Sequence, residues 1–279
     1  MQLPAAASAP TTQDLRQAST RGMRAAIRFG YATRGVVYTL IGALALLWAL
    51  RQSGGRVTDG HGAVERIGEY PWGLPLLWAI AVGLACYAIW NLIRALFDPE
   101  HHGRDAKGVL KRVGWGFSAL TQGFLAAYTF QLAIGEAHGG GHERSLAQLI
   151  SLPGGRIAVA IGGLLVIGFG LVELHRAYKN DVSREYGGGL PTNHRQLVLR
   201  VARIGIAARG LVFPLIGISF IAAAIAADAS QAHGLGEALH DIARQSYGRV
   251  LLGVVATGLV AYGAHMFFMA RYARFAVRV

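Results

Sequence analysis

The amino-acid sequence predicts an all-α membrane protein whose six transmembrane helices form three parallel two-helix repeats. Three observations lead to this fold class. Only 15% of the 279 residues are charged and 53% are hydrophobic, whereas roughly 25% of residues are charged in ordinary soluble domains. Six segments are apolar over the about 20 residues that a helix needs to cross a bilayer. The same two-helix pattern also occurs three times along the chain.

The six predicted spans follow a polar tail. Residues 1–24 are rich in Ala, Thr, Ser and Gln and lack the apolar core of a secretory signal, so we expect a disordered cytoplasmic tail. The second span is uncharged from Pro71 to Ile93, and the sixth from Val250 to Ala270. Such runs are too long for strands or ordinary core helices. The predicted spans are approximately 29–50, 72–94, 113–135, 156–178, 204–227 and 249–271.

Residues spaced four apart repeat in the odd-numbered spans, where they share one helix face and form a ridge. The ridges are Gly30, Arg34, Tyr38 and Gly42; Gly114, Ser118, Gln122 and Ala126; and Gly205, Arg209, Phe213 and Gly217. The even-numbered spans align at Tyr87, Phe169 and Tyr262. We therefore expect two-helix repeats at 25–99, 108–182 and 199–279. Since each repeat crosses the membrane twice, the three are parallel, which predicts a pseudo-threefold arrangement about the membrane normal.

The basic residues predict the orientation. Of the 27 Lys and Arg residues, 18 fall in the tail, the second and fourth connections and the C-terminus, and seven fall in the other three connections. Cytoplasmic loops carry the excess of Lys and Arg, so both termini are expected to be cytoplasmic. We therefore interpret the net charge of +12 as a basic cytoplasmic face that binds anionic lipid headgroups, and not as a surface that binds nucleic acid.

The three outer connections share a plan of a glycine- and histidine-rich piece followed by a short amphipathic segment. The segments are 63–70, 145–152 and 237–245. Their pattern predicts short helices that lie on or dip into the outer interface; plain loops are the alternative.

Several of these motifs resemble a bacterial membrane family catalogued as domain of unknown function 1206. The similar stretches are Arg28-Phe-Gly30-Tyr-Ala-Thr-Arg34-Gly35, Pro71-Trp72-Gly73, Arg203-Ile-Gly205, Arg209-Gly210 and Tyr262-Gly263 with Ala270-Arg271-Tyr272. The middle repeat departs from the pattern, because Ser118-Ala119 replaces Arg-Gly. The resemblance implies a two-helix unit that occurs three times and a location in the bacterial inner membrane, and it implies no activity.

Charged residues inside spans are the candidate site. Arg34 and Arg209 lie about one and a half turns into their helices, where they could reach the headgroups. Glu173 lies at a matching depth, and a carboxylate in a low dielectric needs a partner or a proton. We therefore predict a buried ionic cluster in which Glu173 pairs with Arg34 or Arg209, and Arg176 competes from the same helix.

No catalytic, cofactor or metal site is predicted. The histidine motifs Asp98-x-x-His101-His102 and His138-Gly-Gly-Gly-His142 lack the spacing of structural zinc sites. His265 is interpreted as a hydrogen-bonded core residue rather than a ligand. Glycines of the ridges, together with Ala158-x-x-x-Gly162, are expected to let helix backbones approach closely, and Pro214 could kink the fifth span.

Three functions are compatible with these features. The first is a non-enzymatic scaffold or accessory subunit that binds lipid, another membrane protein or a second copy of the chain. The second is a small-solute transporter or channel along the repeat axis, which the few polar residues inside the spans disfavour. The third is a pocket for a quinone, sterol-like lipid or pigment lined by Tyr38, Tyr87 and Tyr262.

Overall fold

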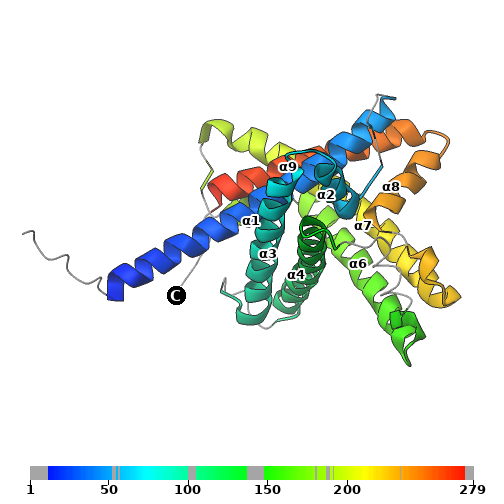
Figure 1. The fold of residues 1–279 in the computed structure, drawn as a ribbon, viewed down its shortest axis with the longest axis horizontal. Helices are drawn as coiled ribbons and strands as arrows, with labels where there is room; N and C mark the ends of the chain where they lie inside the picture. Colours follow the sequence, from blue (N-terminus) through cyan, green and yellow to red (C-terminus); the bar gives the residue numbers. More distant parts are fainter. Residues whose placement is uncertain are drawn as a thin grey trace, which may run out of the picture.

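The computed structural model describes residues 12–51, 55, 57–99, 105–136, 148–179, 181–186, 189–190, 192–232 and 234–273. All regular structure in these residues is helical (Figure 1). The long helices are α1 (Thr12–Ala49), α3 (Gly73–Phe97), α4 (Ala106–Ala133), α6 (Gly155–Tyr178), α7 (Arg195–Ala226) and α9 (Gly248–Tyr272). The short elements are α2 (Gly60–Gly68), α8 (Leu235–Arg244) and the 3₁₀ helices η1 (Asp181–Tyr186), η2 (Thr192–His194) and η3 (Ala229–Gln231).

Five helical segments of the described chain are long and apolar enough to cross a membrane, which indicates a multi-pass membrane protein. They are Thr20–Ala49, Gly73–Phe97, Gly155–Tyr178, Thr192–Ala226 and Gly248–Tyr272. The third predicted span, 113–135, forms most of α4 but is not among them. Its apolar character is interrupted by Ser118, Thr121, Gln122 and Thr129. The six-span arrangement therefore stays a prediction.

The tail predicted to be disordered is partly helical. Helix α1 begins at Thr12, so it includes about half of residues 1–24, and residues 1–11 lie outside the described chain. Residues 12–24 contain Leu, Arg, Gln, Ala and Met, which are good helix formers, and their helix is continuous with the apolar segment that follows.

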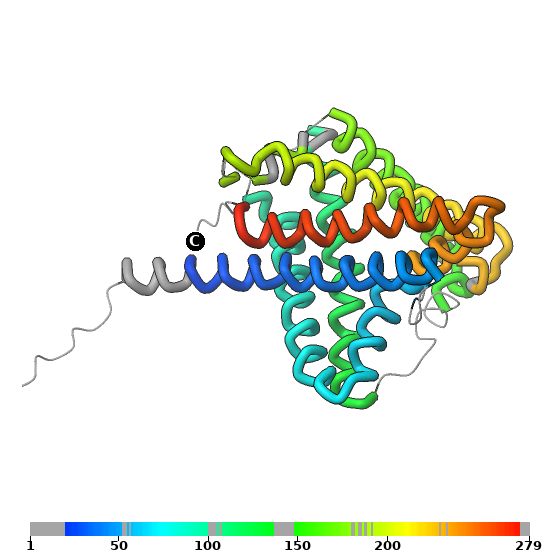
Figure 2. Tube along the Cα trace, turned by 90° about the horizontal axis from the view of Figure 1, so that it is seen from above, coloured from blue at the N-terminus to red at the C-terminus, as the bar shows by residue number. Residues whose placement is uncertain are grey.

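The long helices associate mainly in three pairs, α1 with α9, α3 with α4, and α6 with α7. Each pair joins helices from different repeats. Figure 2 shows α1 and α9 lying side by side, with the N-terminal part of α1 extending beyond α9. The pairs do not run parallel to one another: α1 and α9 cross the view of Figure 1, while α3 and α4 run steeply through it. Smaller contacts within a repeat connect α1 with α3 and α7 with α9.

Glycines on facing helices hold two of these pairs together. A Cβ atom added at Gly163 on α6 would lie 2.6 Å from the carbonyl oxygen of Gly217 on α7, and one at Gly217 would lie 2.5 Å from the oxygen of Gly163. Gly35 on α1 and Gly263 on α9 have the same relation at 3.0 and 2.9 Å. The helix backbones are therefore in direct contact, as small residues permit in membranes.

The expectation that Ala158 and Gly162 form such a contact is wrong. A Cβ at Gly162 would meet no atom within 4 Å, and Ala158 is exposed. The contact face of α6 runs through Gly163 and Gly170 instead. Adjacent residues are about 100° apart around a helix, so a shift of one position turns a residue away from its neighbour.

The two helices within a repeat cross at the first glycine of each ridge. A Cβ at Gly30 would lie 2.7 Å from the backbone nitrogen of Tyr87, and one at Gly205 would lie 2.4 Å from that of Tyr262. In the middle repeat, Gly114 faces the ring of Phe169, at 3.2 Å from the added Cβ. At this crossing a side-chain ring, rather than helix backbone, faces the glycine. Helices α4 and α6 accordingly pack less closely than the two helices of the other repeats.

Two of the predicted short amphipathic helices exist, and they pack into the protein. Helix α2 buries Ala63, Val64 and Ile67 against α1, α3 and α4, and α8 buries a similar face against α7 and α9. Their apolar faces therefore contact helices rather than an open interface. In the middle segment, 145–152, residues 148–151 are helical as well, and residues 145–147 lie outside the described chain.

Candidate functional site

Arg34 and Arg209 are both buried inside the chain. Arg34 is 2% exposed and Arg209 is 7% exposed, so neither guanidinium extends to the headgroups. They come from α1 and α7, at equivalent positions of two ridges. A buried guanidinium requires compensating contacts, and the two arginines share the ring of Tyr262 but differ in most of their polar partners.

Arg34 is surrounded by hydroxyl groups and aromatic rings. Its NH1 donates to the hydroxyl of Tyr87, and it lies 3.4 Å from Oγ of Ser118. The guanidinium carbon lies 4.6 Å from the ring centroid of Tyr87 and 5.4 Å from that of Tyr38. Ser118 is the ridge residue that replaces arginine in the middle repeat, so a serine stands where a third guanidinium would crowd the other two.

Arg209 contacts the buried carboxylate of Glu173. Its NH1 lies 3.6 Å from Oε2 of Glu173 and donates to the hydroxyl of Tyr262 at 2.7 Å. Arg176 donates to the other oxygen, Oε1, at 2.7 Å. The side chain of Glu173 is 5% exposed and that of Arg176 is 31% exposed. The carboxylate is thus shared between a buried and a half-buried guanidinium, and no ion pair with Arg34 is among the described contacts.

Three tyrosines complete the site. The rings of Tyr38 and Tyr262 meet edge to face, with centroids 4.7 Å apart. Both guanidiniums also lie over the ring of Tyr262, at 5.7 Å for Arg34 and 4.9 Å for Arg209. We call Arg34, Arg209, Glu173, Tyr38, Tyr87 and Tyr262 the central cluster. The three tyrosines, which are the predicted lining of a quinone, sterol-like lipid or pigment pocket, pack directly against the arginines.

A tyrosine from a connection reaches the same region. Tyr186 of η1 is fully buried, and its hydroxyl lies 2.8 Å from Nδ1 of His265 on α9. Burial raises the pKa of the Tyr186 phenol, so the hydroxyl stays protonated at neutral pH and shares a hydrogen bond with the imidazole. The ring of His265 lies 5.9 Å from that of Tyr262. Sequence reasoning missed Tyr186, because it lies in a connection without apolar periodicity.

Replacing Tyr186 by phenylalanine is expected to loosen η1 without removing the ring. The change removes the buried hydrogen bond between the hydroxyl and Nδ1 of His265, which costs about 1–3 kcal/mol. The checks are the free energy of unfolding and the rate of proteolysis at the α6–α7 connection, which should rise. The exposed Tyr178 provides the control: Tyr178→Phe should change neither value, and equal effects of the two changes would contradict the assigned bond.

Two basic residues near the starts of α4 and α7 cap the ends of neighbouring helices. Arg112 on α4 donates from Nε to the carbonyl of Ala95 at 2.7 Å and from NH2 to that of Leu96 at 2.9 Å. Arg203 on α7 donates from Nε to the carbonyl of Ala177 at 2.9 Å. These carbonyls lie in the last turns of α3 and α6, where helices lack hydrogen-bond donors and favour a positive charge.

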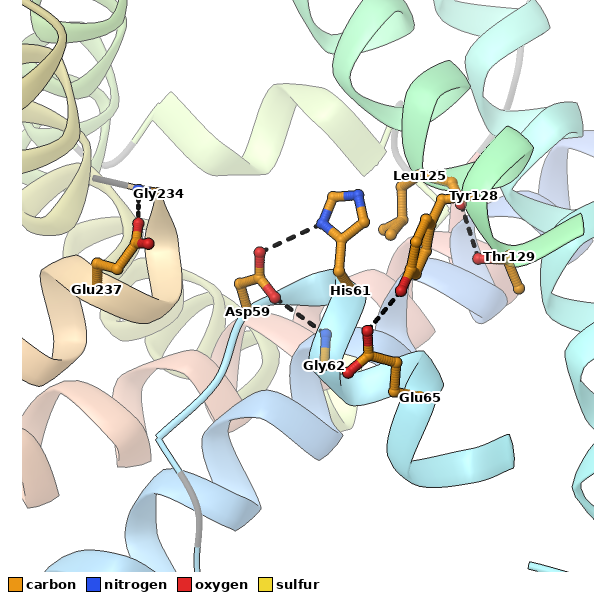
Figure 3. A network of polar contacts seen from close by, with 9 residues as sticks. All are labelled: Asp59, His61, Gly62, Glu65, Leu125, Tyr128, Thr129, Gly234 and Glu237. Atoms are coloured by element: carbon orange, nitrogen blue, oxygen red, sulfur yellow. Dashed lines mark hydrogen bonds and ion pairs between the residues drawn. The ribbon is translucent and has the colours of Figure 1, made fainter. Parts of the chain in front are cut away.

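A second polar network joins α2 to α4 (Figure 3). Asp59 caps α2 by accepting from the N–H of Gly62 at 3.0 Å, and its other oxygen lies 3.2 Å from Nδ1 of His61. Tyr128 donates to Glu65, and its ring lies 4.7 Å from that of His61. Burial alone would raise the pKa of Asp59, but the hydrogen bonds from His61 and Gly62 outweigh it and lower that pKa.

Replacing Asp59 by alanine is expected to destabilise the protein by about 1 kcal/mol, since an N-cap is lost. Asparagine keeps the cap and removes the charge. Because the pKa is lowered in the folded state, the carboxylate stabilises the fold above the ordinary aspartate pKa of about 3.9. That contribution is lost as the pH falls through the lower folded value. Unfolding measured between pH 7 and pH 3 should therefore show a smaller acid dependence in Asp59→Asn than in the wild type.

The histidine motifs fall largely outside the described residues. This applies to His101, His102, His138 and His142. Within the described chain, no group of three or more His, Cys, Asp or Glu side chains is arranged to hold a metal ion.

Comparisons with known proteins match the repeats. The family described as Domain of Unknown Function (DUF1206) matches residues 29–98, 113–180 and 204–273. An "Uncharacterized protein YxxB" of Bacillus subtilis (strain 168) is 30% identical over 240 residues, 85% of this chain and 86% of the relative. No solved structure matches significantly. The matched stretches contain α1 with α3, α4 with α6, and α7 with α9, so one unit occurs three times.

Proposed function

Because the chain belongs to the family described as Domain of Unknown Function (DUF1206), whose description names no activity, we propose a function from its geometry. The protein is a non-enzymatic scaffold or accessory subunit of the bacterial inner membrane. It binds anionic lipid headgroups on a basic cytoplasmic face, and another membrane protein or a second copy of itself through its apolar surface.

The observation that supports a scaffold most strongly is the burial of the central cluster. Its residues are between 2% and 8% exposed. A centre closed to solvent in this way favours a structural role, because a path for solutes needs polar side chains that face water. The cluster also connects α1, α3, α6, α7 and α9, so it stabilises the association of all three repeats.

We propose six spans in a pseudo-threefold arrangement, with α4 as the remaining span. In support, each of the main helix pairs joins the second helix of one repeat to the first helix of another. The glycine contacts are equivalent in two of these pairs: Gly35 with Gly263, and Gly210 with Gly170. Both termini are then cytoplasmic, in agreement with the distribution of Lys and Arg.

Apolar side chains on the outer faces of the helices are the surface for lipid or a partner. Among them are Ile157 and Leu164 on α6, Ile218 and Ile225 on α7, and Val250 on α9, which are 57–79% exposed. In a membrane these side chains contact acyl chains or another apolar helix surface.

The proposal is tested by measuring bound partners and solute movement on one preparation. Protein taken up in discs of native membrane is analysed for co-purifying lipid and protein, and the same protein in liposomes is tested for potassium, chloride and proton flux. We expect enrichment of a partner or of anionic lipid over bulk membrane, and flux equal to that of protein-free liposomes. A saturable flux would establish the alternative, a small-solute transporter or channel.

A further inference from the structure

The central cluster contains more positive charge than its acids balance. Arg34 and Arg209 are buried, and Glu173 is the one acid among the buried residues that the structure describes. That carboxylate already contacts two guanidiniums, those of Arg176 at 2.7 Å and Arg209 at 3.6 Å. Arg34 therefore adds a positive charge for which the buried described residues supply no second carboxylate.

The contacts found for Arg34 in the described chain include no carboxylate. They are the hydroxyls of Tyr38, Tyr87 and Ser118 and the rings of Tyr38, Tyr87 and Tyr262. Nε of Arg34 and Nε of Arg209 are buried without a hydrogen-bond partner in the described chain. Each is thus an unused donor inside the cluster.

The two buried charges also repel each other. The guanidinium carbon of Arg34 lies 5.7 Å from the ring centroid of Tyr262, and that of Arg209 lies 4.9 Å from the same centroid. The two positive charges are therefore close to each other. Like charges interact strongly in a low dielectric, and a charge that is buried without a counter-charge is costly. An anion beside Arg34 would offset both effects.

We propose that the central cluster binds one small monovalent anion of halide size beside Arg34. The guanidinium supplies the charge and an N–H donor, and the hydroxyls of Tyr87 and Ser118 supply O–H donors. The residues around the site are at most 9% exposed, which favours a small ion such as chloride over phosphate or a lipid headgroup. This inference is independent of the scaffold proposal, because binding is measured without flux or a partner.

The experiment is a titration of thermal unfolding with halide. Purified full-length protein in lipid nanodiscs is examined by calorimetry in chloride, bromide and gluconate at constant ionic strength. We expect a saturable rise of the unfolding temperature in chloride and bromide but not in gluconate. Bromide should also produce an anomalous scattering peak beside Arg34 in crystals. A wild-type unfolding temperature that is the same in all three salts would overturn the proposal.

Variants locate the site. Arg34→Gln should weaken the apparent halide affinity by about tenfold or more, since a charge-assisted contact is lost. Arg66→Gln, which changes an exposed arginine paired with Glu69, should leave the affinity unchanged. Should Arg34→Gln not fold, Ser118→Ala removes one hydroxyl and is expected to weaken halide binding several-fold. The assignment would be contradicted if both Arg34→Gln and Ser118→Ala kept full halide affinity, because the anion would then bind elsewhere. If Arg34→Gln does not fold, full affinity in Ser118→Ala alone would contradict it.

Discussion

Replacing Gly163 by leucine is expected to separate α6 from α7 and to destabilise the protein by more than about 3 kcal/mol. A Cβ at this position would lie 2.6 Å from the carbonyl oxygen of Gly217 and 2.9 Å from a side-chain carbon of Ile221. A backbone oxygen cannot rotate away as a flexible side chain can, so the helices have to move apart. Overpacking of cores typically costs about 1–3 kcal/mol, and the loss of the helix contact adds to that.

The preceding residue provides a matched control. A Cβ at Gly162 would meet no atom within 4 Å, so Gly162→Leu changes the same residue type on the same helix without a clash. Folding yield and the free energy of unfolding in mild detergent are the measurements. Gly162→Leu should remain close to the wild type, and a similar loss in both variants would contradict the packing of α6 on α7.

Replacing Glu173 by glutamine is expected to cost about 3–5 kcal/mol, the second large effect. The change leaves the buried guanidinium of Arg209 without its carboxylate, and breaking one side of a buried ion pair is strongly destabilising. It also increases the excess positive charge around Tyr262. The free energy of unfolding at a pH near 7 is the measurement.

The double variant separates the ion pair from general damage. Glu173→Gln combined with Arg209→Gln removes both charges, so it should be more stable than Glu173→Gln alone. Arg176→Gln should cost less, because that side chain is 31% exposed and a half-exposed pair is weak. A double variant as unstable as the sum of both single variants would show that the two side chains are not coupled.

The repeats could be predicted from the sequence because they depend on spacing along one chain. The ridge positions of Gly30 and Gly205 and the aligned Tyr87 and Tyr262 follow from counting, and each glycine meets the tyrosine of its own repeat. The helix period also predicted that Arg34 and Arg209 lie at similar depth. Gly162 shows the limit of such counting, because a ridge of small residues does not specify which side of the helix meets a neighbour.

The partners of the charged residues could not be predicted in the same way. Counting placed Glu173 within reach of Arg34 or Arg209, and the structure places it by Arg209 while Tyr87 and Ser118 surround Arg34. Tyr186 had no signal in its own segment, although it bonds to His265 across 79 positions of sequence. Such contacts depend on how helices pair, and the main pairs join different repeats.

The amino-acid sequence alone was enough for an all-helical chain of three repeats with membrane-length apolar helices. Hydrophobicity, helix period and glycine spacing are local properties, so they can be determined from each segment of the sequence by itself. The central cluster depends on the folded chain instead. Its rings and guanidiniums come from α1, α3, α6, α7 and α9, so its charge balance exists only once those helices are packed together.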